Sequence, residues 1–154
     1  MREPGMQEEE MNQSLLTSAT DAMLALVVDD ADARDPRGLR GVVADSAVTE
    51  GPEHPSHIRR FEVDEAGRVR GGDIFVTTVG VPDGMRVDRD GNLWASAGPG
   101  VEVYTPEATL LGRIAFPADV TNLEFGAPDD GRLFVTAGGS LYLLEVLARG
   151  ARWT

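Results

Sequence analysis

A unit of about forty residues repeats in the second half of this chain, and this repeat constrains the fold more than any other feature. The stretch DGNLW at residues 90–94 is matched by DGRLF at residues 130–134. Val101 and Val103 are matched by Leu141 and Leu143 at the same separation. Repeats of this length, built from short strands and turns that contain Gly, are typical of the blades of a β-propeller.

Residues 85–96 predict the inner hairpin of one such blade. Residues 85–88 (MRVD) alternate apolar and polar side chains, which is the pattern of a strand with one buried face. Residues 90–92 (DGN) supply the turn chemistry of a hairpin, and residues 93–95 begin the returning strand. Asp83 stands just ahead of the first strand, so we expect its carboxylate at the mouth of that strand.

The sequence therefore predicts an all-β fold, an incomplete β-propeller of about three four-stranded blades. Residues 41–150 would hold these blades, of which we expect the first to be damaged or incomplete. Residues 1–40 form a poorly matched N-terminal segment that we expect to be irregular or partly helical. Propellers typically close with 4–8 blades. Three blades leave open edges, so we expect self-association through these edges.

The composition excludes several classes of protein. The formal net charge of −12 argues against nucleic-acid binding, which needs clustered Lys and Arg. The chain has no Cys, so disulfides, thiolate zinc sites and thiol catalysis are excluded. The most apolar stretch, residues 22–28, is much shorter than the roughly 20 residues needed to span a bilayer. We expect a cytoplasmic protein with no membrane or nucleic-acid partner.

Residues 82–94 (PDGMRVDRDGNLW) resemble the SMP-30/gluconolactonase/LRE-like family. Members of this family are six-bladed propellers that hydrolyse sugar lactones or related cyclic esters with a metal-assisted water. The resemblance therefore implies a hydrolase whose partner is a small-molecule lactone. The similarity also covers residues 57–64 (HIRRFEVD), 100–106 (GVEVYTP), 120–126 (VTNLEFG) and 133–137 (LFVTA).

The resemblance also implies one divalent cation in the central channel, Ca²⁺ first, with Zn²⁺ and Mn²⁺ as alternatives. The Asp of the family's Pro-Asp-Gly motif carries over to Asp83, which implies that Asp83 is both a metal ligand and the catalytic base. From spacing alone, Asp83 could equally be a turn residue that bonds its neighbouring backbone. Asn122 matches the position of Gly84 in the next blade, so we expect Asn122 or Thr121 to contact the substrate. Capping of the strand turn is the alternative for this pair.

The family's other two cation ligands have no clear counterpart. Glu50 lies in an EGP sequence like that of the family, but in what we expect to be an insertion loop of a later blade. Arg37 stands in the sequence PRGL, where the family has Asn. A second hypothesis is therefore a non-catalytic, truncated propeller fragment that acts as a binding or assembly module.

Other polar and aromatic residues have simpler interpretations. Asp88 and Asp90 resemble part of a calcium loop, but hairpin turn chemistry explains them better. We expect His54 and His57 to be surface residues. Trp94 and Phe134 occupy the same position of the repeat, which predicts packing between blades.

Overall fold

The computed structural model describes residues 27–29, 39–45, 56–63, 68–126 and 131–151. Every regular element in these ranges is a β-strand, and the strands pair in antiparallel fashion, which confirms the all-β prediction. Residues 1–40 were predicted to be irregular or partly helical, but residues 27–29 and 39–40 of this segment lie in β-strands, so for them the prediction was wrong. The rest of the segment lies outside the described residues. Within the described ranges, no helix has the length and apolar character needed to cross a membrane.

The first sheet contains four strands: β1 (Val27–Asp29), β2 (Leu39–Asp45), β3 (His57–Val63) and β4 (Val69–Thr77). The expectation of a damaged first blade was therefore wrong. The reason is that β1, whose residues all lie before position 41, pairs with Arg40, Gly41 and Val42 of β2. Residues 30–38, which are rich in charge and include Pro36, separate the two strands in sequence, so the sequence alone did not indicate their pairing.

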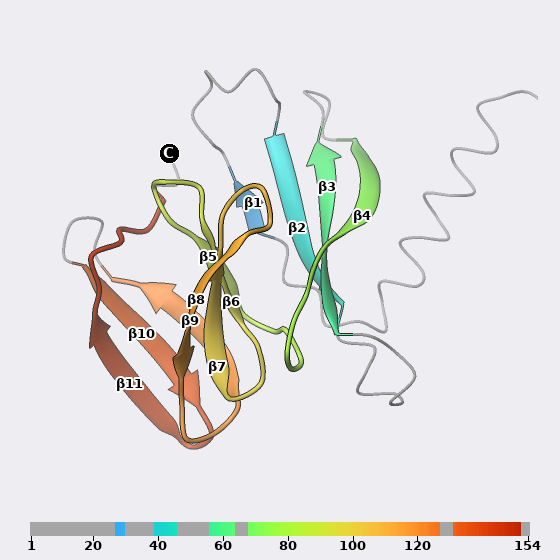
Figure 1. Ribbon diagram of the computed structural model, residues 1–154. Helices are drawn as coiled ribbons and strands as arrows, with labels where there is room; N and C mark the ends of the chain where they lie inside the picture. Colours follow the sequence, from blue (N-terminus) through green and yellow to red (C-terminus); the bar gives the residue numbers. More distant parts are fainter. Residues whose placement is uncertain (1–26, 30–38, 46–55, 64–67, 127–130, 152–154) are drawn as a thin grey trace, which may run out of the picture.

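The second and third sheets follow the order that the repeat predicts. The second sheet has four strands and the third has three, and Figure 1 shows the second sheet between the other two. The strands of the second sheet are β5 (Met85–Val87), β6 (Leu93–Ser96), β7 (Gly100–Tyr104) and β8 (Leu110–Ala115). Those of the third sheet are β9 (Val120–Phe125), β10 (Arg132–Ala137) and β11 (Ser140–Glu145).

The sheets pack face to face through two apolar clusters. Between the first and second sheets, Ile58 and Val76 meet Met85 and Tyr104. Between the second and third sheets, the Trp94 ring meets the Phe125 ring edge to face, with centroids 5.4 Å apart. Trp94 therefore packs between blades as predicted, whereas Phe134 on β10 is only half-buried and does not join this cluster.

The first strands of the three sheets lie next to one another. β5 contacts β1 on one side and β9 on the other. This arrangement of successive inner strands is the one found around the axis of a propeller. The chain that follows β11 returns to the C-terminal end of β5, where the Ala151 N–H donates to the Val87 carbonyl at 3.0 Å. The inner strand of the second sheet is thus held on both sides.

The turn between β5 and β6 is organised by the buried carboxylate of Asp88. One oxygen accepts hydrogen bonds from the backbone N–H groups of Asp90 (3.0 Å) and Asn92 (2.9 Å). The other accepts from Asn92 Nδ2 (3.0 Å) and from Trp94 Nε1 (2.9 Å). Gly91 adopts a φ of +80°, as the hairpin requires. These contacts confirm a turn role for Asp88.

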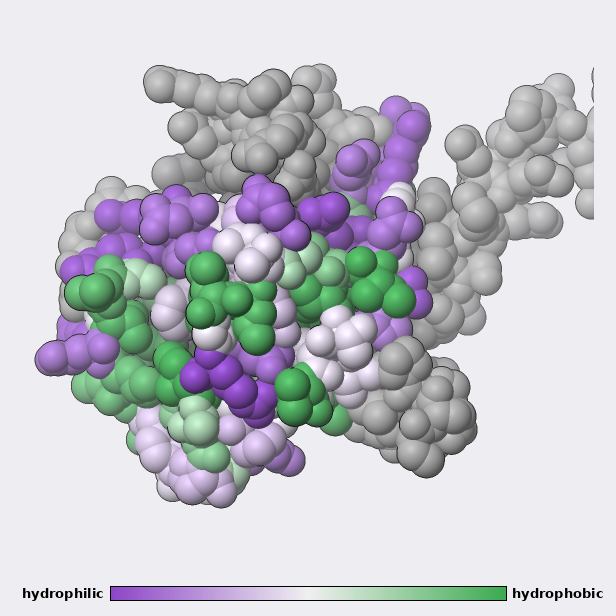
Figure 2. All heavy atoms as spheres, viewed as in Figure 1, coloured by the Kyte–Doolittle hydropathy of each residue, from purple (hydrophilic) through white to green (hydrophobic). Residues whose placement is uncertain are grey.

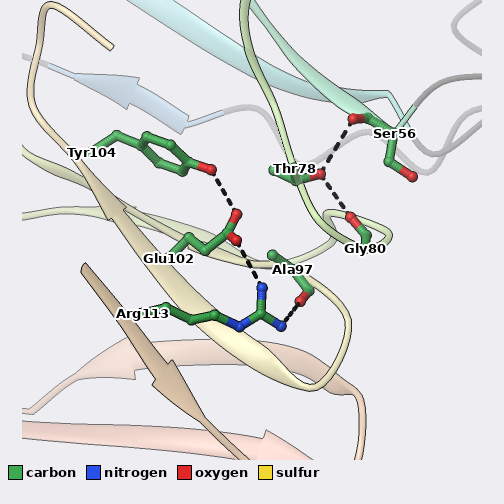
Figure 3. A network of polar contacts seen from close by, with 7 residues as sticks. All are labelled: Ser56, Thr78, Gly80, Ala97, Glu102, Tyr104 and Arg113. Atoms are coloured by element: carbon green, nitrogen blue, oxygen red, sulfur yellow. Dashed lines mark hydrogen bonds and ion pairs between the residues drawn. The ribbon is translucent and has the colours of Figure 1, made fainter. Parts of the chain in front are cut away.

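A buried polar network fixes the second sheet (Figure 3). Glu102 is 1% exposed, and its carboxylate accepts from Tyr104 Oη at 2.6 Å and from Arg113 Nη1 at 2.7 Å. Arg113 Nη2 also donates to the Ala97 carbonyl at 2.8 Å. Burial, followed by the hydrogen bond to Glu102, raises the pKa of the Tyr104 hydroxyl above its ordinary range, so the phenol remains a donor.

The prediction that His57 is a surface residue was wrong. His57 begins β3 and is buried, because this strand lies between β2 and β4. His54 lies outside the described residues. The sequence around His57 alternates as a strand, but the alternation alone does not indicate that both faces of this strand end are covered.

Candidate channel site

Asp83 lies in the connection that leads from β4 into β5. Its backbone N–H donates to Ser96 Oγ at 2.8 Å. Ser96 in turn donates its own N–H to the Gly84 carbonyl at 2.9 Å. These two bonds extend the β5–β6 ladder to the residue after Asp83. The backbone of Asp83 is therefore held at the start of the inner strand, where the sequence predicts this residue, and its side chain is half-buried.

The third sheet directly contacts Gly84, the residue that follows Asp83. The Gly84 N–H donates to the Thr121 carbonyl at 3.1 Å. A Cβ atom placed on Gly84 would come within 2.6 Å of the Asn122 Cα atom and would also meet the Asn122 amide oxygen. Only Gly allows the two inner strands to approach this closely. The structure therefore brings the three predicted site residues, Asp83, Thr121 and Asn122, to one junction between β5 and β9.

Burial changes the acidity of Asp83. The pKa of its carboxyl is raised above the ordinary value because the surrounding protein removes part of its water. A carboxylate with a raised pKa holds a proton more strongly, which makes it a better general base near neutral pH than a fully solvated aspartate. The electrostatics of this position thus suit proton transfer.

Thr121 and Asn122 are exposed on β9. Asn122 Oδ1 accepts from the Leu123 backbone N–H at 2.9 Å, and the Thr121 and Thr136 hydroxyls are 3.0 Å apart. This contact with the backbone of the next residue is a local role of the capping kind that the sequence leaves open. Its exposure leaves room for a ligand on the same side.

An ion pair that the sequence interpretation missed spans the same two strands. Arg86 on β5 donates to one carboxylate oxygen of Glu124 on β9 through Nε and Nη2, each at 2.7 Å. A signal was available, because Met85 and Val87 match Leu123 and Phe125 in the repeat. Arg86 and Glu124 are then equivalent positions with opposite charges on neighbouring inner strands.

The described residues supply only part of a cation site. The carboxylate of Asp83 and the amide oxygen of Asn122 have the hard-oxygen chemistry that Ca²⁺ prefers, but Ca²⁺ takes six to eight such ligands. Within the described ranges, His, Asp and Glu side chains nowhere gather in a group of three that could hold a metal ion. Glu50 and Arg37 lie outside these ranges. This junction alone therefore does not fit a complete cation cage.

Comparison with known proteins identifies what this architecture resembles. Residues 45–139 match the profile of the SMP-30/Gluconolactonase/LRE-like region. The chain is 40% identical over 89 residues to the pentonolactonase XacC of Haloferax volcanii, covering 53% of this chain and 31% of that protein.

Two solved structures show the same fold. A gluconolactonase from Xanthomonas campestris superposes with a TM-score of 0.59 at 31% identity, over 73% of this chain and 34% of that one. A calcium-binding regucalcin from Agrobacterium tumefaciens superposes with a TM-score of 0.61 at 22% identity, over 75% of this chain and 45% of that one. The matched solved structures are six-bladed propellers, and this chain spans well under two thirds of their length.

Proposed function

Because the chain belongs to the SMP-30/gluconolactonase/LRE-like family, we propose that it hydrolyses sugar lactones or related cyclic esters, with Asp83 as the general base. The observation that carries this proposal is the junction of β5 and β9. Asp83, a half-buried carboxylate of raised pKa, directly precedes Gly84, and Gly84 contacts the two exposed polar residues Thr121 and Asn122. The lactonases among its relatives support the substrate class.

The proposed reaction needs one proton carrier. Asp83 accepts a proton from a water molecule whose oxygen attacks the lactone carbonyl carbon. The bond between that carbon and the ring oxygen then breaks, and the ring oxygen leaves as a hydroxyl that takes the proton back from Asp83. The product is a hydroxy acid, and the carboxylate of Asp83 is regenerated. Asn122 and Thr121 would orient the substrate by hydrogen bonds to its hydroxyl groups.

We further propose that Asp83 contributes one ligand to a divalent cation, Ca²⁺ ahead of Zn²⁺ and Mn²⁺. The calcium-binding relative supports this choice. Such an ion, when bound, polarises a carbonyl oxygen. The junction described here supplies too few oxygen ligands to hold it alone, so the other ligands would come from outside these residues.

A pH-stat assay tests the proposal, because hydrolysis of a lactone releases an acid. The whole chain is assayed with gluconolactone in the presence of Ca²⁺, Zn²⁺ or Mn²⁺, and the spontaneous hydrolysis is subtracted. We expect turnover that depends on the added cation and that falls by about 10²–10⁴-fold in Asp83→Ala. Undiminished activity in Asp83→Ala would remove Asp83 from the mechanism.

A non-catalytic binding or assembly module is the second candidate. The observation that favours it is the lack of a three-residue acidic or His cluster among the described residues. This candidate predicts no turnover with any of the three cations. It also predicts that a lactone or its hydroxy acid still binds, which calorimetric titration would detect.

A further inference from the structure

The first and third sheets form the two ends of the array. The internal repeat indicates that the outer face of each end sheet is of the type that packs against a neighbouring sheet. Val101 and Val103 on β7 are 0% and 9% exposed, because they pack against the third sheet. Leu141 and Leu143 occupy the same positions of the repeat on β11, yet they are 68% and 56% exposed. The third sheet thus repeats an interblade face with nothing packed on it among the described residues.

The aromatic positions support the same conclusion. Trp94 on β6 packs against Phe125 of the next sheet, with ring centroids 5.4 Å apart. Its equivalent, Phe134 on β10, pairs with Leu143 across the strands and therefore shares the face of the exposed leucines. We call Phe134, Leu141 and Leu143 the leading face. Figure 2 shows hydrophobic surface over the part of the molecule that β10 and β11 form in Figure 1.

At the other end of the array, the first sheet exposes the face that points away from the second sheet. Ile58 and Val76 point toward the second sheet. Arg59 and Ile74 pair across β3 and β4 and lie on the other side, where Ile74 is 57% exposed. Phe61, two residues after Arg59, lies on this side too and is half-buried. We call Arg59, Phe61 and Ile74 the trailing face.

We propose that a second copy of this chain closes the ring, with the trailing face of each copy packed on the leading face of the other. The described residues form three sheets, and the relatives' rings contain six, so two copies supply the full number. The contact would repeat the face-to-face packing already present twice within the chain. A two-fold axis along the channel makes both new contacts identical and leaves no open face.

Closure would also complete the channel. The two-fold axis brings a second Asp83, with its own Asn122, Arg86 and Glu124, to the opposite wall. Each copy alone contributes one such junction. The inner strand β1 of the partner would come to lie beside β9, as β9 lies beside β5 within the chain. The proposal concerns assembly and does not depend on lactone hydrolysis, because the oligomeric state is measured without activity.

Light scattering after size-exclusion chromatography tests the assembly of the whole chain. We expect twice the mass of one chain for the wild type. Leu143→Glu places a charge on the leading face and is expected to weaken self-association at least tenfold. Leu111→Glu is the matched control, since Leu111 is 58% exposed but lies on β8 of the second sheet. A monomeric wild type, or a Leu143→Glu dimer as tight as that of the control, would overturn the proposal.

Cross-linking distinguishes ring closure from simple pairing of two β11 edges. The chain has no Cys, so engineered thiols are the only ones present. With a short bismaleimide, Ile74→Cys/Leu143→Cys is expected to give a covalent dimer, whereas Leu143→Cys alone is expected to give little. In a closed ring the two Leu143 positions lie in separate interfaces, but in an edge-paired dimer they lie close together. Equal cross-linking of the single and double variants would contradict ring closure.

Discussion

Gly84 on the way into β5 lies directly against Asn122 on β9, so close that a Cβ atom at Gly84 would be 2.6 Å from the Asn122 Cα atom. This contact joins the inner strands of two successive sheets. It also places the residue after Asp83 against a second candidate site residue. Both the packing of the second sheet against the third and the geometry of the candidate site therefore require glycine at position 84.

Replacement of Gly84 by Ala is expected to separate the two inner strands. Because the obstructing atoms include the backbone of Asn122, the clash cannot be relieved by a rotamer change alone. We expect a loss of about 1–3 kcal/mol in the free energy of unfolding, measured by urea denaturation. Gly112→Ala is the control, because nothing lies within 4 Å of the added Cβ. Equal stability of the two variants would contradict the close approach.

Much of this arrangement could be predicted from the sequence. The forty-residue repeat and the alternation in residues 85–88 gave the strands of the second and third sheets and placed Asp83 at a strand mouth. Repetition also carried the signal for the Arg86–Glu124 pair, which a search for opposite charges at equivalent positions would have found. Burial was harder to predict, because whether His57 or Phe134 is covered depends on which sheet packs beside it.

The first sheet shows a different limit. β1 has three residues, and residues 30–38 separate it from β2 in sequence, so neither length nor turn chemistry indicates the pairing. The metal site could not be predicted from residues alone either. The ligands of a cation site come from several blades, and the spacing of residues in the sequence does not determine which of their side chains converge in space.

The hydrogen bonds that the Asp88 carboxylate accepts predict that its removal destabilises the turn between β5 and β6. Asp88→Ala would leave the Trp94 indole N–H and the turn N–H groups of Asp90 and Asn92 without their acceptor. We expect a destabilisation of about 1–3 kcal/mol and altered Trp fluorescence in thermal or urea unfolding. Asp90→Ala, at an exposed turn position, should change stability by no more than about 0.5 kcal/mol. Similar losses in both variants would show that Asp88 does not organise the turn.

The network around Glu102 predicts strong coupling between three side chains. Tyr104→Phe removes the 2.6 Å hydrogen bond to the buried carboxylate and is expected to cost about 1.5–3 kcal/mol. Arg113→Met leaves the charge of Glu102 without its cation, with a loss of about 3 kcal/mol. In the Arg113→Met background, Glu102→Gln should recover part of that loss. Additive effects in this double-mutant cycle would refute the network.

The raised pKa of Asp83 predicts a pH dependence of stability. Its folded-state pKa lies above the unfolded value, so its contribution is fully present below the unfolded pKa, near 4, and is lost as the pH rises through the folded pKa. Asp83→Asn removes this loss. The melting temperature of Asp83→Asn relative to the wild type should therefore rise between about pH 4 and neutral pH. A constant difference across that range would show that burial does not perturb this carboxyl.

The initial rate of gluconolactone hydrolysis by the whole chain, with Ca²⁺ present, tests the central claim most directly. The wild type, Asp83→Asn and the control Asp90→Asn are compared at one pH after subtraction of spontaneous hydrolysis. If Asp83 is the general base, Asp83→Asn falls by about 10²–10⁴-fold while Asp90→Asn keeps the wild-type rate. Catalysis by Asp83→Asn at the wild-type rate, or a wild type no faster than water, would contradict the account.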